Sequence, residues 1–142
     1  MDSKQGLDLA TLTDEALAAR ADDWDTITWS ERQEAATELD RRRYVALTAA
    51  LDVGDGVHYC VGTDRYAATV VARTPATITI QVDEARNVAT WPEQDWRFSR
   101  NEDGRRQTFT RRKDGAYLAK GAKSRGEGFL RIGRNQYLDP HF

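Results

Sequence analysis

The sequence is poor in the residues that build covalent and metal-dependent sites. Its 142 residues include one cysteine, Cys60, and two histidines, His58 and His141. An intrachain disulfide is therefore impossible, and zinc or iron–sulfur sites that need several cysteines are excluded. His58 and Cys60 share one face of an expected strand, an arrangement more typical of packing than of a metal site. We expect no catalytic residue, no metal site and no cofactor; a hydrolase is the minor alternative.

Long hydrophobic runs are also missing. No apolar stretch approaches the roughly 18 residues that a membrane-spanning helix needs. The N-terminal segment MDSKQGLDL has no apolar stretch of the kind found in signal peptides. The content of 39% hydrophobic and 31% charged residues is typical of a folded globular domain. We therefore expect a cytoplasmic protein with no membrane partner.

The two halves of the chain carry opposite charge. Residues 1–56 contain 6 basic and 13 acidic side chains, whereas residues 57–142 contain 15 basic and 10 acidic ones. The hydrophobic period also changes near the Gly- and Asp-rich segment DVGDG, which is a typical chain breaker. We expect an acidic helical extension over residues 1–52 and a basic β domain over residues 53–142.

Helix signals dominate the first unit. Thr13 is followed by two acids and can cap a helix over about 13–22. Ser30 with Gln33 three residues later fits a capping box, which predicts a second helix over about 31–51.

Three consecutive arginines, residues 41–43, form a possible basic cluster within the second helix. Glu38 lies three and four residues before the first two, which is the favourable order for helical ion pairs. We therefore expect these arginines to form a solvated face that pairs with its own acid.

The second unit changes to a period of two residues. Ile78, Ile80 and Val82 alternate with polar residues, which indicates a strand with one buried face. Residues 65–73 give its hairpin partner, with a turn at residues 74–75. Further short strands are expected within residues 57–61, 96–100, 107–111, 117–118 and 129–132. The predicted class is α+β, with an N-terminal helical pair followed by a small antiparallel β-barrel, SH3-like, of about six strands.

Two resemblances accompany this pattern. The segments VGDGV (53–57) and DRYAATVV (64–71), followed by the Thr/Ile strand, resemble the opening of SH3-like barrels of the KOW or Tudor type. The stretch from residue 53 to residue 142, with TFTRRKDG (108–115) and the closing DPHF, resembles a recurrent group of small bacteriophage and bacterial proteins. The first likeness implies a barrel. The second implies an origin in a mobile element and brings no activity with it.

Cations are concentrated late in the chain. Residues 97–134 hold twelve Lys or Arg and four acids. The interleaved aromatics Phe98, Phe109 and Tyr117 are expected to fill the barrel, and strand alternation divides the cations between two faces. The candidate nucleic-acid-binding residues are then those of the hairpin and of the Gly-rich loop at 121–128, namely Arg105, Arg106, Arg112, Lys120, Lys123 and Arg125.

Two functional hypotheses from different classes follow. In the first, the protein is a nucleic-acid-binding accessory protein whose barrel hairpin and Gly-rich loop contact the phosphates of DNA or RNA. In the alternative, it is a protein-interaction module, such as a phage-encoded modulator of a host factor, that docks on a host or phage protein. The acidic helices favour the alternative, because they would repel a polyanion and their acids could engage a basic partner or fold over the domain's own basic face.

Overall fold

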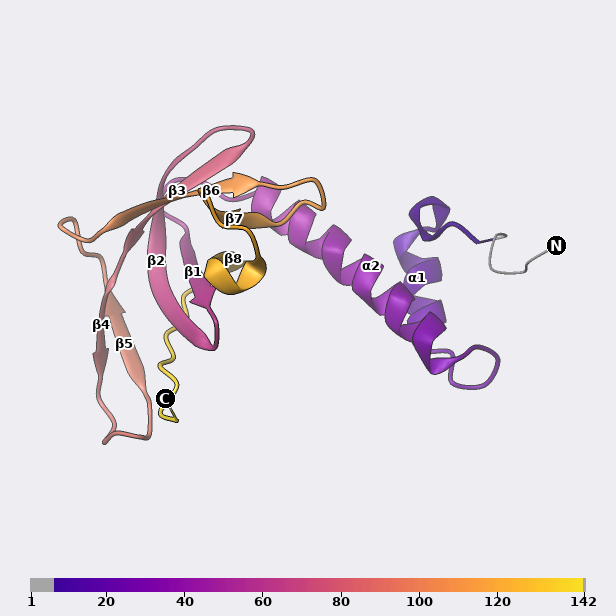
Figure 1. The fold of residues 1–142 in the computed structure, drawn as a ribbon, viewed down its shortest axis with the longest axis horizontal. Helices are drawn as coiled ribbons and strands as arrows, with labels where there is room; N and C mark the ends of the chain where they lie inside the picture. The colour runs from indigo at the N-terminus through magenta and orange to yellow at the C-terminus, as the bar shows by residue number, and fades with distance from the viewer. Residues whose placement is uncertain (1–6, 142) are drawn as a thin grey trace. The chain divides into compact units, whose positions relative to one another are not determined.

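The computed structural model describes residues 7–141 and divides the chain into two compact units, 1–46 and 47–142. A 3₁₀ turn, η2 (Leu9–Thr11), precedes helices α1 (Asp14–Ala21) and α2 (Trp29–Ala49). The strands that follow are β1 (Gly56–Val61), β2 (Asp64–Arg73), β3 (Thr77–Val82), β4 (Glu84–Asn87), β5 (Trp96–Ser99), β6 (Arg106–Arg111), β7 (Tyr117–Ala119) and, after the 3₁₀ turn η3 (Arg125–Glu127), β8 (Phe129–Ile132). Figure 1 shows this order along the chain.

Both predicted helices form, but the second begins differently from the prediction. The Thr13 hydroxyl accepts from the Ala16 N–H at 3.1 Å and caps α1 as expected. In α2 the capping box is made by Thr28 and Glu31, whose side chains each accept from the other residue's backbone N–H at 3.1 and 3.2 Å. The predicted cap at Ser30 is therefore wrong, because a Thr-x-x-Glu pair two residues earlier offers a charged partner for the N-terminal N–H groups.

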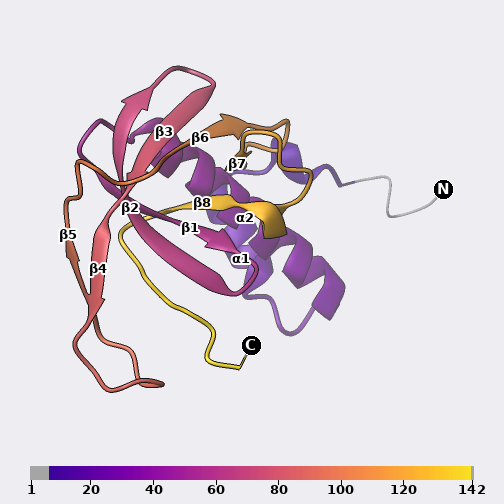
Figure 2. The same cartoon turned by 60° about the vertical axis from the view of Figure 1, so that its left-hand side comes forward.

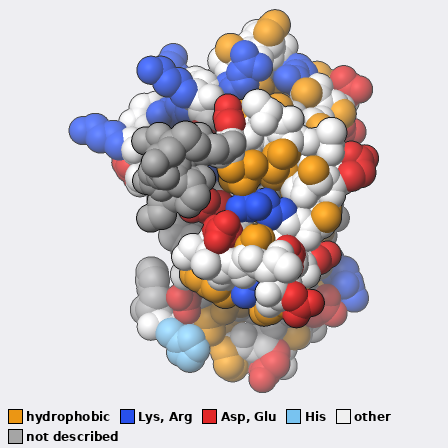
Figure 3. All heavy atoms as spheres, turned by 90° about the vertical axis from the view of Figure 1, so that its right-hand side faces the viewer, with side chains coloured by type: hydrophobic (Ala, Val, Ile, Leu, Met, Phe, Trp, Pro, Cys, Tyr) orange, Lys and Arg blue, Asp and Glu red, His pale blue; other side chains and the backbone are white. Residues whose placement is uncertain are grey.

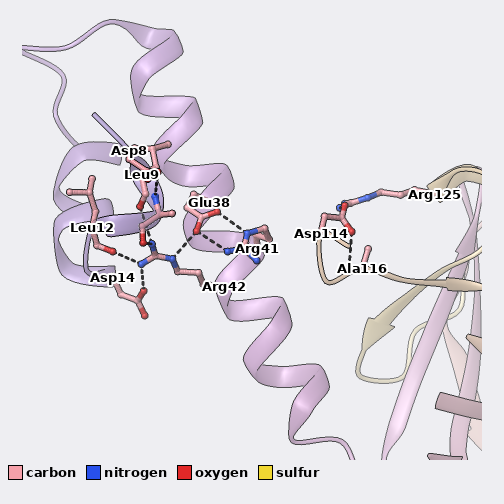
Figure 4. Close-up of polar contacts among 11 residues, drawn as sticks. Asp8, Leu9, Leu12, Asp14, Glu38, Arg41, Arg42, Asp114, Ala116 and Arg125 are labelled. Atoms are coloured by element: carbon pink, nitrogen blue, oxygen red, sulfur yellow. Dashed lines mark hydrogen bonds and ion pairs between the residues drawn. The ribbon is translucent and has the colours of Figure 1, made fainter. Parts of the chain in front are cut away.

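The helical unit has a small core of Leu17, Ala35 and Leu39. Beside it, Arg42 acts as a hub (Figure 4): its guanidinium pairs with Glu38 at 2.8 Å and with Asp14 at 3.1 Å. The same group donates to the Leu12 carbonyl at 2.6 Å and to the Leu9 carbonyl at 2.9 Å. Arg41 also pairs with Glu38, at 2.7 Å, which confirms the expected pairing with that acid. The expectation of a solvated face is wrong for Arg42, whose side chain is 21% exposed and bonded to residues outside its own helix.

A closed antiparallel barrel forms the second unit, in the order β1-β2-β3-β6-β7-β8. The expected α+β class with a small six-stranded barrel is confirmed. Val57, Ile78, Ile80, Phe109 and Leu130 are fully buried and fill its interior. The alternating Thr/Ile strand thus presents its isoleucines to the core, as its period predicted.

The last turn of α2 belongs to the barrel unit. The Arg73 guanidinium, at the end of β2, donates to the carbonyl oxygens of Thr48 at 2.9 Å and Leu51 at 2.7 Å. These acceptors would otherwise be unsatisfied at a helix C-terminus, and the positive charge also complements the helix dipole there. The bonds explain why residues 47–52 group with the barrel, although the sequence placed them in the helical extension.

β4 and β5 form a separate two-stranded ribbon beside the barrel (Figures 1 and 2). The sequence analysis expected the strand within residues 96–100 to belong to the barrel and predicted no strand at residues 84–87. Instead, β4 continues the chain after Asp83 and pairs with β5 from Glu84↔Ser99 to Asn87↔Trp96. Phe98 is 37% exposed, so its predicted place in the core is wrong, whereas Phe109 and Tyr117 are buried as predicted.

Candidate nucleic-acid interface

A cleft of about 660 Å³ lies on the outer face of the barrel, over β2, β1 and β8. The register places Arg65 of β2 opposite Cys60 of β1, and Cys60 opposite Phe129 of β8, so these three side chains form one row across the strands. The walls are formed by the β1–β2 turn, by η3 and by the C-terminal segment, residues 133–141. We call this the arginine cleft; its lining is Cys60, Gly62, Thr63, Arg65, Arg125, Gly126, Phe129, Arg131, Tyr137, Asp139 and His141.

Two of the three arginines in the cleft, Arg125 and Arg131, contact the aromatic ring of Phe129. The guanidinium carbon of Arg125 lies 4.7 Å from the centroid of the Phe129 ring, and that of Arg131 lies 5.8 Å from it. Such cation–π contacts hold the long side chains over the ring without neutralising them. The cleft therefore combines fixed positive charge with an aromatic surface.

Among the residues that the structure describes, one of these arginines has a carboxylate partner. Arg125 pairs with Asp114 at 3.2 Å (Figure 4), and both side chains are more than half exposed. Within residues 7–141, Arg65 and Arg131 form no ion pair. Hydrogen bonding from the Ala116 N–H, followed by the nearby Arg125 charge, lowers the pKa of Asp114, so this acid is ionised at neutral pH.

The C-terminal segment forms one wall of the cleft. The β3 ladder on β2 begins only at Ala68, which leaves the first residues of β2 open on that side. There the Arg65 N–H donates to the Tyr137 carbonyl at 2.7 Å, and the Tyr137 N–H donates to the Arg65 carbonyl at 3.0 Å. The Ala67 N–H is satisfied by the side-chain oxygen of Gln136 at 3.0 Å. In Figure 2 this segment, in yellow, runs back past β2.

Carboxylates fasten the far end of the same wall. The Thr63 hydroxyl donates to Asp139 at 2.8 Å, and the Asp139 N–H donates to Asp64 at 2.8 Å. The pKa of Asp139 is lowered, chiefly by the hydrogen bond from the His141 N–H and then by that from Thr63. Asp64 and Asp139 thus use their carboxylates in hydrogen bonds that hold the C-terminal segment against the β1–β2 turn.

A buried polar cluster anchors the start of the C-terminal segment. Asp83, whose side chain is fully buried, accepts from Arg134 at 2.9 Å and from the Thr69 hydroxyl at 2.7 Å. Arg134 also donates to Thr69 at 2.9 Å, which closes the triangle. Gly56 makes room for it, because a Cβ atom there would lie 2.4 Å from the Arg134 guanidinium.

His58 and Cys60, which share one face of β1, both have side chains that are at least partly buried within the fold. His58 is buried beneath the C-terminal segment, where its Nδ1 lies 2.7 Å from the Gly133 carbonyl, and burial lowers its pKa. Burial likewise raises the pKa of the Cys60 thiol, which stays protonated at neutral pH. Among the described residues, no group of three or more His, Cys, Asp or Glu side chains could hold a metal ion.

The structure separates the predicted site residues. Arg125 lies in the arginine cleft, and Arg105 lines a second cleft at one end of the barrel. Arg112 is occupied within the fold: it donates to the Ala122 carbonyl at 2.9 Å and to the Ala119 carbonyl at 3.1 Å. The remaining three, Arg106, Lys120 and Lys123, are exposed and line neither cleft.

Sequence reasoning missed Arg65 and Arg131. A local signal did exist for Arg65, because a two-residue turn at Gly62 and Thr63 places it opposite Cys60. Gly62 has a φ of +57°, the left-handed conformation that such a turn needs. For Arg131 the relevant pairing is with His58 across the closing strands β1 and β8, which no local pattern reveals.

Comparison with protein-family models, with curated proteins and with solved structures gives no match. Among residues 7–141, no helix has both the length and the apolar character that crossing a membrane requires. The functional interpretation therefore depends on the geometry and charge of the two units.

Proposed function

We propose that the protein is a nucleic-acid-binding accessory protein that holds phosphates of DNA or RNA in the arginine cleft. The observation that carries this proposal is the convergence of Arg65, Arg125 and Arg131, from three separate elements, in one cleft, with Arg125 and Arg131 over the ring of Phe129. Guanidinium groups bind phosphate oxygens through paired N–H donors, and each neutralised phosphate releases condensed counterions.

The state of the arginines supports this role. Arg65 and Arg131 are exposed and unpaired within the described residues, so a ligand phosphate would not have to compete with a carboxylate for them. Arg125 has a competitor in Asp114, but exposed ion pairs of this kind contribute less than about 1 kcal/mol. A phosphate with charge-assisted hydrogen bonds would displace it at small cost.

We propose binding without catalysis. The thiol of Cys60, on the cleft floor, has a pKa raised by burial, which disfavours the nucleophilic thiolate. His58, behind that floor, has a pKa lowered by burial and a hydrogen bond to Gly133. Both features support a packing role for the pair.

The proposal is tested by fluorescence anisotropy with labelled DNA and RNA oligonucleotides at several salt concentrations. Three phosphate contacts predict a slope of about −2 for log K against log salt on a single strand. Arg65→Gln and Arg131→Gln should each weaken binding and reduce the magnitude of that slope by about 0.7.

The matched control is Lys113→Gln, which removes the same charge from an exposed position that lines neither cleft. It should change affinity far less than either arginine variant. If the control and the cleft variants lose affinity equally, binding follows net charge and the cleft is not the site. If the unaltered protein binds neither DNA nor RNA at low salt, the proposed function is wrong.

A second candidate is a protein-interaction module, and one observation favours it. Trp24 and Trp29 of the helical unit are 73% and 65% exposed, unusual values for tryptophan in a monomeric protein. The Arg32 guanidinium lies 3.5 Å from the centroid of the Trp24 ring, which fixes the ring in place. On the face drawn in Figure 3, acidic side chains are scattered among hydrophobic ones rather than gathered in one patch.

Pull-down from a bacterial lysate with the intact protein and with Trp24→Ser/Trp29→Ser tests this candidate. A protein retained stoichiometrically by the former and lost with the latter would support it. The absence of any stoichiometric protein, or its equal retention by both, would count against it.

A further inference from the structure

A second cleft, of about 590 Å³, opens at one end of the barrel and has the same mixture of ring and cation as the first. Its walls include Tyr59, Tyr66 and Arg105. The two tyrosine rings are stacked, with centroids 5.2 Å apart and planes at 29°. We call this the barrel-end cleft.

Arg105 is held in position there but keeps donors to spare. One of its terminal nitrogens donates to the Tyr59 hydroxyl at 2.7 Å. A guanidinium has five N–H donors, and Arg105 forms no ion pair within the described residues. The Tyr59 contact therefore orients the group without neutralising it, which suits it to an anionic ligand.

The two clefts lie on opposite faces of the same β1–β2 hairpin. Tyr59 pairs with Tyr66, and the next pair along the ladder is Cys60 with Arg65. Since successive residues of a strand point to opposite faces, the tyrosine pair faces the barrel-end cleft while the Cys60 and Arg65 pair faces the arginine cleft. The hairpin ends in the two-residue turn Gly62–Thr63, so only a narrow tip separates the clefts.

We infer that a single nucleic-acid strand crosses this tip, with phosphates in the arginine cleft and a neighbouring nucleotide in the barrel-end cleft. The inference rests on the proposed function and specifies its substrate class. Arg65, Arg125 and Arg131 hold the first subsite, and Arg105 with the Tyr66 ring holds the second. Each subsite then offers a cation to a phosphate and a ring to an unpaired base.

The mechanical properties of nucleic acids select the single strand. Duplex DNA bends smoothly only over lengths comparable with its persistence length of about 150 base pairs, so it cannot fold over a two-residue turn. A single strand can, and its unstacked bases are free to meet aromatic rings. A site of about four nucleotides is expected, at the small end of the range for small barrels that bind single strands.

The dependence of affinity on oligonucleotide length tests this inference. Anisotropy is measured with labelled oligothymidylates of two, four and eight nucleotides and with an eight-base-pair duplex, for the intact protein, Arg131→Gln and Arg105→Gln. Arg131→Gln should weaken binding at every length. Arg105→Gln should leave the affinity for the dinucleotide unchanged and weaken binding of the octamer about ten-fold. That loss corresponds to the contacts of one nucleotide. The duplex should bind more weakly than the octamer.

Arg106→Gln is the matched control, because it removes the same charge from the adjacent residue, which is exposed and lines neither cleft. Thermal unfolding of each variant identifies any that lose affinity because they lose the fold. If Arg105→Gln does so, Tyr66→Leu takes its place, because it removes the tyrosine ring of the barrel-end cleft and keeps Arg105. The inference is overturned if Arg105→Gln and Tyr66→Leu have no effect at eight nucleotides, if they weaken the dinucleotide equally, or if the duplex binds as tightly as the octamer. Failure of every oligonucleotide to bind the intact protein overturns the proposed function itself.

Discussion

Arg134 donates to the carboxylate of Asp83 over 2.9 Å and joins the start of the C-terminal segment to the end of β3, 51 residues earlier in the chain. The carboxylate is fully buried, whereas the guanidinium remains 36% exposed. Removing the guanidinium would leave a buried charge whose one remaining side-chain donor within residues 7–141 is the Thr69 hydroxyl.

We therefore expect Arg134→Met to lower the free energy of unfolding by about 2 kcal/mol, because a buried carboxylate loses a charge-assisted hydrogen bond from a partly exposed cation. Urea denaturation followed by tryptophan fluorescence measures this. Arg97→Met is the control, since its pair with Asp95 is more than half exposed on both sides and should contribute less than about 1 kcal/mol. Equal losses in the two variants would contradict the buried-pair explanation.

Asp114 is expected to restrain ligand binding at the arginine cleft. Its carboxylate competes with a phosphate for Arg125, to which it is bonded at 3.2 Å. Asp114→Asn should therefore tighten oligonucleotide binding two- to five-fold, the range that an exposed ion pair supports. Anisotropy titration at low salt measures the change, and unchanged or weaker binding would show that Arg125 does not contact the ligand.

Glu38 should make the helical unit sensitive to acid. Ion pairs with Arg41, and then with Arg42, lower its pKa from 4.5 to about 2. Because the unfolded chain binds this proton more tightly, the contribution to stability is complete above about pH 4.5 and is lost as the pH falls toward 2.

The Glu38→Gln variant isolates this carboxylate from the others that titrate in the same range. The difference in thermal midpoint between the intact protein and the variant, followed by circular dichroism at 222 nm, should be largest at neutral pH and vanish near pH 2. A difference independent of pH would show that the ion pairs do not stabilise the unit.

The start of α2 gives a prediction that separates two neighbouring hydroxyls. Thr28→Ala removes the side chain that accepts from the Glu31 N–H and should cost about 1 kcal/mol. Ser30→Ala, at the position that the sequence favoured, should change stability by less than about 0.5 kcal/mol because Ser30 is an exposed residue inside the helix. Urea denaturation distinguishes the two variants. A larger loss of stability in Ser30→Ala than in Thr28→Ala would show that Ser30 caps the helix, as the sequence predicted.

Local patterns predicted those parts of the fold that local physics determines. Alternation in residues 77–82 placed Ile78 and Ile80 in the core, and Thr13 marked the start of α1. The β4–β5 ribbon was not predicted, because the strand EARN has no fully buried face and its sequence therefore shows no alternation of hydrophobic and polar residues.

The candidate site was predicted less completely, for a topological reason. Arg125 was among the candidates, but the cleft exists only because β8 closes the barrel against β1, bringing Arg131 beside His58 and Phe129 beside Cys60. Pairings over such separations leave no trace in neighbouring residues. Arg112 shows the converse: its surroundings were basic in sequence, yet all three of its guanidinium nitrogens donate within the fold, to the Thr110 hydroxyl and to the carbonyls of Ala119 and Ala122.

The C-terminal segment has a further consequence for how copies of the protein behave together. An open strand edge is a template on which another chain can add a strand, and so a starting point for aggregation. The backbone pairing of Tyr137 with Arg65, and the Gln136 side chain on the Ala67 N–H, occupy the part of β2 that β3 leaves open. The segment that walls the cleft thereby also occupies a strand edge on which another copy could otherwise add a strand.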